Sequence, residues 1–196
     1  MKVGLYFGTY NPIHVGHLAI ANYLVEFSEI DQLWFVVSPQ SPFKTNKKLL
    51  DNYQRLEMIN RAIDDDRRFR ASSIEFKLPI PSYTIDTLTY LKEEYPSHDF
   101  YLIMGADNLL YIDKWKNTEL ILSDNKILVY PRPGINETAL KKHPNIQFVN
   151  APVMEISASF IRKSIAEGKD VRHFIPYKAW QYLDEMNFYK QFPSSK

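Results

Sequence analysis

The amino-acid sequence predicts a single α/β domain, with a mostly parallel sheet, helices on both faces and a helical C-terminal end. Short runs of β-branched and aromatic residues, typical of buried strands, alternate with segments whose apolar residues recur at helical spacing. This alternation indicates βαβ units, which form parallel sheets covered on both faces. A chain of 196 residues also has the usual size of one domain. The predicted strands are Lys2–Phe7, Gln32–Ser38, Phe69–Phe76, Asp99–Met104, Asn125–Tyr130 and Ile146–Val149.

The segments between these strands favour helices. Apolar residues from Leu18 to Val25 have helical spacing, and Asp51 is a candidate N-cap for a helix that continues to Ile63. Ser82 is a candidate cap for a helix whose apolar residues recur every three positions. Shorter helices are expected at 120–123 and 137–142, and two further helices within Ile156–Glu185, separated at Gly168.

Composition and charge exclude several classes of protein. The 24 lysine and arginine residues balance 23 acidic residues, so the net charge of +1 gives no general attraction to nucleic acid or anionic lipid. No apolar run reaches the roughly 18 residues of a membrane span, and the one before Gly8 is too short for a signal peptide. The absence of cysteine excludes disulfides and thiolate metal ligands. We therefore expect a cytoplasmic protein that binds neither nucleic acid nor membrane.

The most informative motif follows the first predicted strand and reads Gly8-Thr9-Tyr10-Asn11-Pro12-Ile13-His14-Val15-Gly16-His17. In open α/β sheets, ligands bind beyond the carboxyl ends of the strands, and a helix N-terminus offers free N–H groups to a phosphate. His14 and His17 are three residues apart, so they share one face of the helical start and can donate to the same anion. The motif predicts a phosphate site, with an incidental histidine in a capped helix start as the alternative.

Arg162 ends a second motif, Ile156-Ser157-Ala158-Ser159-Phe160-Ile161-Arg162. Ser157 or Ser159 can cap a helix here, and Arg162 lies one turn further, where its planar guanidinium can reach an anion. An ordinary capped helix would also explain this segment. The chain contains no P-loop, Gly-x-Gly-x-x-Gly, His-Glu-x-x-His or Gly-x-Ser-x-Gly motif, so the commonest nucleotide-binding and hydrolase patterns are excluded.

The two motifs together resemble the signatures of the nucleotidylyltransferase superfamily, (His/Thr)-x-Gly-His and Ile-Ser-Ser-Thr-x-Ile-Arg, and Asn-Pro in the first is similar to bacterial nicotinate-nucleotide adenylyltransferases. Ala158 and Ser159 depart from the second signature, and one hydroxyl is lost. The resemblance extends from Lys2 to about Tyr189. It implies a single Rossmann-like nucleotidylyltransferase domain over residues 1–196, with a helical C-terminal part at about 156–189 and a flexible tail at 190–196.

Other segments also match the family. The resemblance implies that Lys44 approaches the triphosphate, although Phe43 replaces the histidine that usually precedes this lysine. A mobile, solvated lysine is the alternative. Arg55 fits an Arg-x-x-Met pattern, and we interpret it as mainly a helix-face residue that orients this loop. Ser82-Tyr83-Thr84 resembles the nicotinate-specific segment, which implies that main-chain donors of Thr84 bind the pyridine carboxylate. Trp115 matches the tryptophan that stacks on the pyridine ring.

The implied reaction joins nicotinate mononucleotide to the adenylyl group of ATP by direct in-line displacement of pyrophosphate. The attacking phosphate is already ionised near neutral pH, so no general base is needed. The implied catalytic residues are His14, His17, Lys44 and Arg162. The implied ATP-binding residues are Gly8, Thr9, Tyr10, His14, His17, Lys44, Gly105, Asp107, Arg132, Ile156, Ser157, Ser159 and Arg162. The implied nicotinate mononucleotide-binding residues are Asn11, Ser82, Tyr83, Thr84 and Trp115.

Magnesium is the expected cofactor, bound mainly through the ATP phosphates, and no protein metal site is expected. The expected partners are ATP and nicotinate mononucleotide, and the sequence leaves a homo-oligomer open. Two alternatives remain. One is an adenylyltransferase for another phosphate, such as nicotinamide mononucleotide or phosphopantetheine, from which residues 82–88 and Trp115 distinguish the nicotinate enzymes. The other is a nucleotide-binding sensor without turnover, which pyrophosphate release would exclude.

Overall fold

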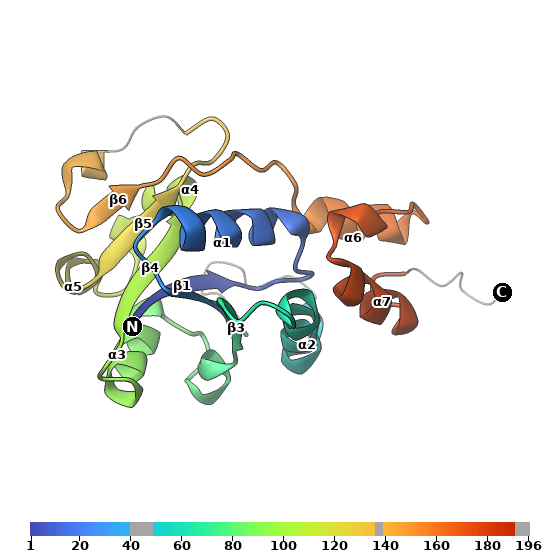
Figure 1. The fold of residues 1–196 in the computed structure, drawn as a ribbon, viewed down its shortest axis with the longest axis horizontal. Helices are drawn as coiled ribbons and strands as arrows, with labels where there is room; N and C mark the ends of the chain where they lie inside the picture. Colours follow the sequence, from blue (N-terminus) through green and yellow to red (C-terminus); the bar gives the residue numbers. More distant parts are fainter. Residues whose placement is uncertain (40–48, 136–138, 191–196) are drawn as a thin grey trace.

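The computed structural model describes residues 1–39, 49–135 and 139–190. Its strands are β1 (Lys2–Gly8), β2 (Gln32–Val37), β3 (Phe69–Ser72), β4 (Asp99–Gly105), β5 (Lys126–Tyr130) and β6 (Ile146–Phe148). They form one six-stranded sheet in the order β3-β2-β1-β4-β5-β6, and every neighbouring pair is parallel (Figure 1). The α/β class and the parallel sheet expected from the sequence are therefore confirmed.

Helices connect the strands. The α-helices are α1 (Val15–Phe27), α2 (Asn52–Ile63), α3 (Thr84–Glu94), α4 (Ala106–Leu109), α5 (Thr118–Asp124), α6 (Ala158–Ala166) and α7 (Tyr177–Glu185). Short 3-10 turns lie at η1 (Ile74–Lys77), η2 (Ile112–Lys114), η3 (Ala139–Lys142) and η4 (Arg172–Phe174). Of the helix expected at 137–142, residues 137 and 138 lie outside the described residues, and the rest is the 3-10 turn η3. The stop at Gly168 is confirmed, with a left-handed φ of 73° between α6 and α7.

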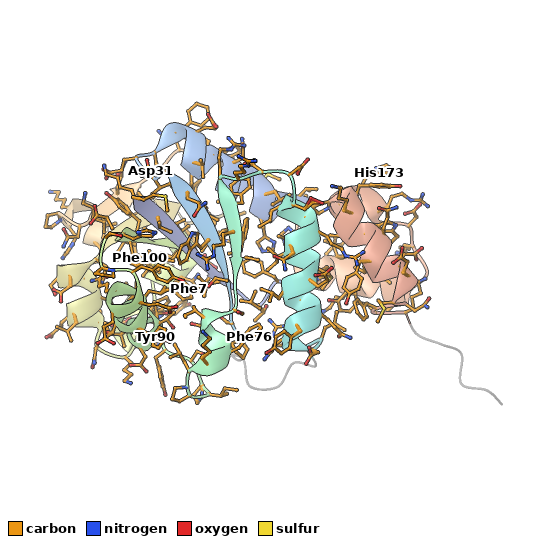
Figure 2. The ribbon with its side chains drawn as sticks, turned by 60° about the horizontal axis from the view of Figure 1, so that its bottom comes forward. Phe7, Asp31, Phe76, Tyr90, Phe100 and His173 are labelled. Carbon is orange, nitrogen blue, oxygen red and sulfur yellow. The ribbon has the colours of Figure 1, made fainter. Side chains whose placement is uncertain are left out.

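Alternate residues of each strand pack on opposite faces of the sheet. Leu33 and Phe35 of β2 belong to a core that α1, α2, α6 and α7 complete, whereas Trp34 and Val36 face a second core against α3. Figure 1 shows α1 and α3 on opposite sides of β1, and Phe7, Tyr90 and Phe100 of the α3 side are labelled in Figure 2. A third cluster packs α5 against β4 and β5. Helices thus cover both faces, as expected for a parallel sheet.

Some local signals in the sequence were interpreted correctly. Asp51 caps α2 by accepting from the Tyr53 N–H at 2.8 Å, and Ser157 caps α6 by accepting from the Phe160 N–H at 3.2 Å. The cap expected at Ser82 is wrong, because Tyr83 occupies the N-cap of α3 and no side chain caps it.

The strand expected over Phe69–Phe76 is too long. β3 ends at Ser72, opposite Val36, and β2 itself ends one residue later. A strand that continued to Phe76 would have no neighbour to bond with on that side, since β2 is the only strand β3 pairs with in the described sheet. The chain instead turns into η1, where Glu75 is buried and accepts from the Thr87 hydroxyl at 2.8 Å.

Because all the strands run in one direction, their carboxyl ends meet at one edge of the sheet. α1 begins at this edge, and α6 and α7 lie beyond the same end of β1 (Figure 1). Among the described residues, no helix has both the length and the apolar character needed to cross a membrane. The carboxyl edge is the place where an open parallel sheet binds its ligands.

Candidate active site

A cavity of about 260 Å³ lies at the carboxyl end of β1, between the starts of α1 and α6. We call it the histidine cavity. The first and second sequence motifs, about 150 residues apart, both line its wall, as the sequence led us to expect. The residues expected at the active site that line it are Thr9, Tyr10, Asn11, His14, His17, Arg132, Ile156, Ser157, Ser159 and Arg162.

His14 and His17 form a stacked pair at the start of α1. Their ring centroids are 3.7 Å apart and the rings are inclined by 27°. The main-chain N–H of His14 donates to His17 Nδ1 at 3.3 Å, so the neutral His17 ring carries its proton on Nε2. His14 Nδ1 is buried and has no hydrogen-bond partner among the described residues. Within the described chain, Nε2 of each ring makes no hydrogen bond and is not among the buried atoms, so each ring keeps that nitrogen for a ligand.

The environment of the two histidines disfavours their charged forms. Burial, with a smaller effect of the Arg132 charge, lowers the pKa of His14 to about 4. Burial and the neighbouring His14 and Arg132 hold the pKa of His17 well below its usual value. At neutral pH the two imidazoles are thus uncharged hydrogen-bond donors. Permanent positive charge at the cavity comes from the guanidinium groups of Arg132 and Arg162.

Arg162 reaches from α6 to the turn that follows β1. Its Nη1 donates to the Asn11 carbonyl at 2.6 Å, and its Nη2 donates to the Ser159 hydroxyl at 3.3 Å. The helix start itself is fixed by the Ser157 cap. These contacts hold the guanidinium against the wall of the histidine cavity. Because Asn11 belongs to the first motif and Arg162 to the second, the two motifs are joined by a direct hydrogen bond.

Arg132 follows β5, lines the same cavity and packs beside Gly105 at the end of β4. Its Nε donates to Asp107 Oδ1 at 3.2 Å. A Cβ atom on Gly105 would lie 2.3 Å from that Oδ1 and 2.9 Å from Arg132 Nε. Gly105 therefore makes room for this ion pair. Neither Gly105 nor Asp107 lines the cavity in the described part of the chain; Asp107 reaches it only through Arg132.

Gly8 makes room for a side chain of the protein, the ring of Tyr10. A Cβ atom on Gly8 would lie 2.8 Å from Cζ of Tyr10, whose ring packs over the end of β1. Tyr10 has a left-handed φ of 45°, and its ring meets the His17 ring edge-on at 5.1 Å. A buried aromatic residue with such a backbone is costly, and such residues are concentrated at functional sites. Tyr10 thereby packs against His17 of the histidine pair.

A second group of expected residues lies apart from the histidine cavity. Ser82, Tyr83 and Thr84 form the start of α3, and Trp115 is packed against the β4–β5 core. Lys116 connects the two segments, since its Nζ lies 2.9 Å from Asp86 and 4.9 Å from the Tyr83 ring centroid. We call this region the α3 end. Within the described chain, none of these residues lines the cavity.

Two features suit the α3 end to a polar ligand. No side chain caps the first N–H groups of α3, so they are open to an acceptor. The Ser82 hydroxyl is buried and has no hydrogen-bond partner among the described residues. Asn11, expected to act with this group, lies instead in the wall of the histidine cavity.

Arg55 does not lie on an exposed helix face, as the sequence suggested, but it does contact both flanks of the loop that it was expected to orient. Its side chain is 0% exposed. Its guanidinium donates to the carbonyls of Thr9 (2.5 Å), Ser38 (2.9 Å) and Leu50 (3.0 Å), and burial lowers its pKa. It therefore fixes the turn after β1 and both sides of residues 40–48. Lys44 falls in that interval, outside the described residues, and its expected role stays a prediction.

Sequence reasoning also missed Tyr189. Its hydroxyl donates to Asn11 Oδ1 at 2.7 Å across 178 residues of chain. No local pattern signals such a contact, because neither residue type nor spacing relates position 189 to position 11. The histidine cavity thus combines neutral donors, two guanidinium groups and hydroxyl groups, an arrangement that suits a polyphosphate.

Comparison with known proteins agrees with this chemistry. The family model described as Cytidylyltransferase-like matches residues 5–164. A protein of Flavobacterium johnsoniae named as a probable nicotinate-nucleotide adenylyltransferase is 54% identical over 193 residues, which cover 97% of this chain and 100% of the relative. A Bacteroides thetaiotaomicron protein with the same name is 46% identical and covers 94% of this chain and 92% of the relative.

Solved structures share the fold. The Plasmodium falciparum nicotinic acid mononucleotide adenylyltransferase complexed with NaAD superimposes with a TM-score of 0.81 at 22% identity, and covers 96% of this chain and 97% of the other. A second structure of that protein, complexed with APC, gives a TM-score of 0.79 at 22% identity and covers 96% of each chain. At such identities the likeness concerns the fold alone.

Proposed function

Because the chain belongs to the nicotinate-nucleotide adenylyltransferase family, within the cytidylyltransferase-like proteins, we propose that it transfers the adenylyl group of ATP to nicotinate mononucleotide. The products are nicotinate adenine dinucleotide and pyrophosphate. The observation that carries this proposal is the joint placement of His14, His17, Arg132 and Arg162 around one cavity. Full-length identity of 54% to a relative of this name supports it.

The reaction is a direct displacement at phosphorus. An oxygen of the mononucleotide phosphate attacks the α-phosphorus of ATP, a new P–O bond forms, and the bond to the bridging oxygen of the pyrophosphate breaks. The attacking phosphate is ionised near neutral pH, so catalysis consists of positioning two anions and stabilising the charge that moves to the leaving group. No covalent intermediate is required.

The residues of the histidine cavity divide this work. His17 offers Nε2–H, and His14 is a second neutral donor; donors held in place before the reaction stabilise developing charge without reorganisation. Arg132 and Arg162 supply the positive charge that the neutral imidazoles lack. Thr9, Ser157 and Ser159 provide hydroxyl groups and helix-start N–H groups for the nucleotide.

The α3 end is our candidate for the nicotinate group. The uncapped N–H groups that begin at Thr84 suit the pyridine carboxylate. Trp115 lies on the neighbouring segment and would stack on the cationic pyridine ring. Nicotinamide lacks the carboxylate charge, so this arrangement favours nicotinate.

Magnesium would enter with the triphosphate. Among the described residues no group of three or more His, Asp or Glu side chains is arranged to hold a metal ion, and Mg²⁺ commonly keeps water and phosphate oxygens as its ligands. When bound, the ion would neutralise charge on the departing pyrophosphate. Among its described lining residues the cavity has Arg132 and Arg162, which bind phosphate oxygens, and no carboxylate, so the ion would be held by phosphate and water. We propose that the protein is cytoplasmic, since a chain without cysteine fits a reducing compartment.

A substrate panel tests the proposal. The purified protein is mixed with ATP and, in separate reactions, with nicotinate mononucleotide, nicotinamide mononucleotide or phosphopantetheine, and dinucleotide and pyrophosphate are measured. We expect nicotinate mononucleotide to be strongly preferred. Preference for either other substrate would contradict the role of the α3 end, and absence of pyrophosphate in all reactions would favour a nucleotide-binding sensor. As a negative control, the Arg162→Gln variant should lower product formation close to background in the same assay.

A further inference from the structure

Tyr189 joins the end of the chain to the active-site turn. Its hydroxyl donates to Asn11 Oδ1 at 2.7 Å. Burial raises the pKa of Tyr189, with a partial offset from the nearby Arg162 and Arg55 guanidiniums, so the phenol keeps its proton and acts as a donor. The phenol is therefore protonated and able to donate at neutral pH.

Asn11 is a junction between distant parts of the chain. Its Oδ1 also accepts from the Leu50 N–H at 3.3 Å, and its carbonyl accepts from Arg162 Nη1 at 2.6 Å. Asn11 is 1% exposed and lies in the wall of the histidine cavity. Whatever fixes the Asn11 side chain also fixes the carbonyl that holds Arg162, because both belong to one residue in a tight turn.

The chain adopts a costly conformation to bring Tyr189 to this position. Tyr189 has φ of 64° and Asn187 has φ of 54°, both in the left-handed region. Asparagine tolerates this region, whereas a tyrosine there is uncommon. Between them Phe188 is anchored in the core, since its N–H donates to the Leu183 carbonyl at 3.0 Å and its ring meets Tyr182 at 5.5 Å. Strain held at a buried contact with a functional turn indicates a role in the site.

We propose that Tyr189 is a positioning residue of the active site, which acts through Asn11 to hold Arg162 against the nucleotide. The inference rests on the proposed function for its kinetic consequences, but the contact itself is independent of the substrate. The phenol fixes the Asn11 amide, the Asn11 carbonyl fixes one arm of the guanidinium, and Ser159 fixes the other. A preorganised guanidinium contributes more to catalysis than a mobile one.

The test is Tyr189→Phe, which removes only the hydroxyl. We expect kcat/KM for ATP to fall about tenfold, and a non-hydrolysable ATP analogue to bind about fivefold more weakly in calorimetry, as expected for the loss of one buried hydrogen bond. The matched control is Tyr182→Phe on α7, whose hydroxyl has no hydrogen-bond partner within the described chain; it should leave both quantities within about twofold. Equal effects of the two variants, or no effect of Tyr189→Phe, would overturn the proposal.

A double-mutant cycle separates positioning from general stability. In an Asn11→Ala background the Tyr189→Phe change should cause no further loss, whereas in an Asn11→Asp background, which keeps an acceptor oxygen, the loss of about tenfold should return. If Asn11→Ala does not fold, the Asp background and an Arg162→Lys background give the same comparison. Equal losses in every background would show a merely structural role.

The two proposals fail in different ways. A wild-type protein that binds the ATP analogue but forms no dinucleotide would contradict the proposed function, and analogue binding would still test Tyr189. A wild-type protein that binds no analogue would overturn both.

Discussion

The histidine cavity and the α3 end are organised in different ways. In the cavity, buried or partly buried hydrogen bonds join segments far apart in sequence, such as Arg162 to Asn11 and Arg55 to Thr9. At the α3 end, Lys116 joins the two segments through an exposed ion pair with Asp86 and a contact with the Tyr83 ring, and the buried Ser82 hydroxyl has no partner among the described residues. The contacts that hold the proposed triphosphate site are thus present before any ligand binds. At the α3 end, our candidate for the pyridine site, we expect the ligand to supply the missing partners, which would suit a region that must distinguish a carboxylate from an amide.

The strongest test of the proposed triphosphate site is His17→Ala. Removal of one preorganised donor should lower kcat by roughly 10²–10³ while circular dichroism and KM for nicotinate mononucleotide stay close to wild type. Steady-state kinetics at saturating ATP give the result. If the folded variant keeps its full turnover, the cavity is not where the chemistry takes place and the comparison fails.

The second test concerns stability. Arg55→Met should lower the free energy of unfolding by about 3 kcal/mol, because the carbonyls of Thr9, Ser38 and Leu50 lose their donor in a buried position. Urea denaturation measures the change. Arg61→Met on the same helix is the control; its ion pair with Glu57 is solvent-exposed, so a much smaller loss is expected. A similar loss for both variants would mean that the burial of Arg55 has no special weight.

The third test is the dependence of stability on pH. The pKa of His14 is about 4 in the folded protein and near 6.5 when unfolded, so below pH 6.5 the unfolded chain binds the extra proton. Stability should therefore fall as the pH is lowered from 6.5 to 4, by on the order of 1.4 kcal/mol per pH unit for each such histidine. His14→Gln should flatten this slope in thermal unfolding. An unchanged slope would show that the cavity does not bury a neutral imidazole there.

The smallest expected effect sharpens the other side of the comparison. Trp115→Ala should raise KM for nicotinate mononucleotide roughly tenfold through loss of stacking, and leave KM for ATP within about twofold. Lys116→Ala, which removes only the exposed pair with Asp86, should change either constant by less than about twofold. A rise in KM for ATP in the tryptophan variant would show that the two regions do not act separately.

The sequence predicted most of the fold and one side of the site. The parallel sheet, the caps at Asp51 and Ser157 and the pairing of His14 with His17 all follow from local pattern and spacing. The burial of Arg55 against the turn after β1 and the role of Tyr189 could not be predicted, since the contacts to Thr9 and Asn11 span 46 and 178 residues and depend on the assembled fold.

Two local interpretations failed for tertiary reasons. The strand from Phe69 is shorter than its composition predicts, because its length is set by its neighbour β2. Ser82 has the right residue type for a cap, but it lies buried one position before the N-cap Tyr83. Glycine gave a third lesson. Gly8 and Gly105 are among the implied ATP-binding residues, but in the structure the space beside them is taken by the side chains of Tyr10, Asp107 and Arg132.

The two ends of the chain differ in their distance from the chemistry. The amino group of Met1 bonds the Ser97 carbonyl at the edge where the strands begin, whereas α7 and Tyr189 lie at the edge where they finish (Figure 1). An affinity tag or a fused partner is therefore best attached before Met1. At the other end, even a short deletion that reached Tyr189 would remove one of the hydrogen bonds that hold the turn after β1.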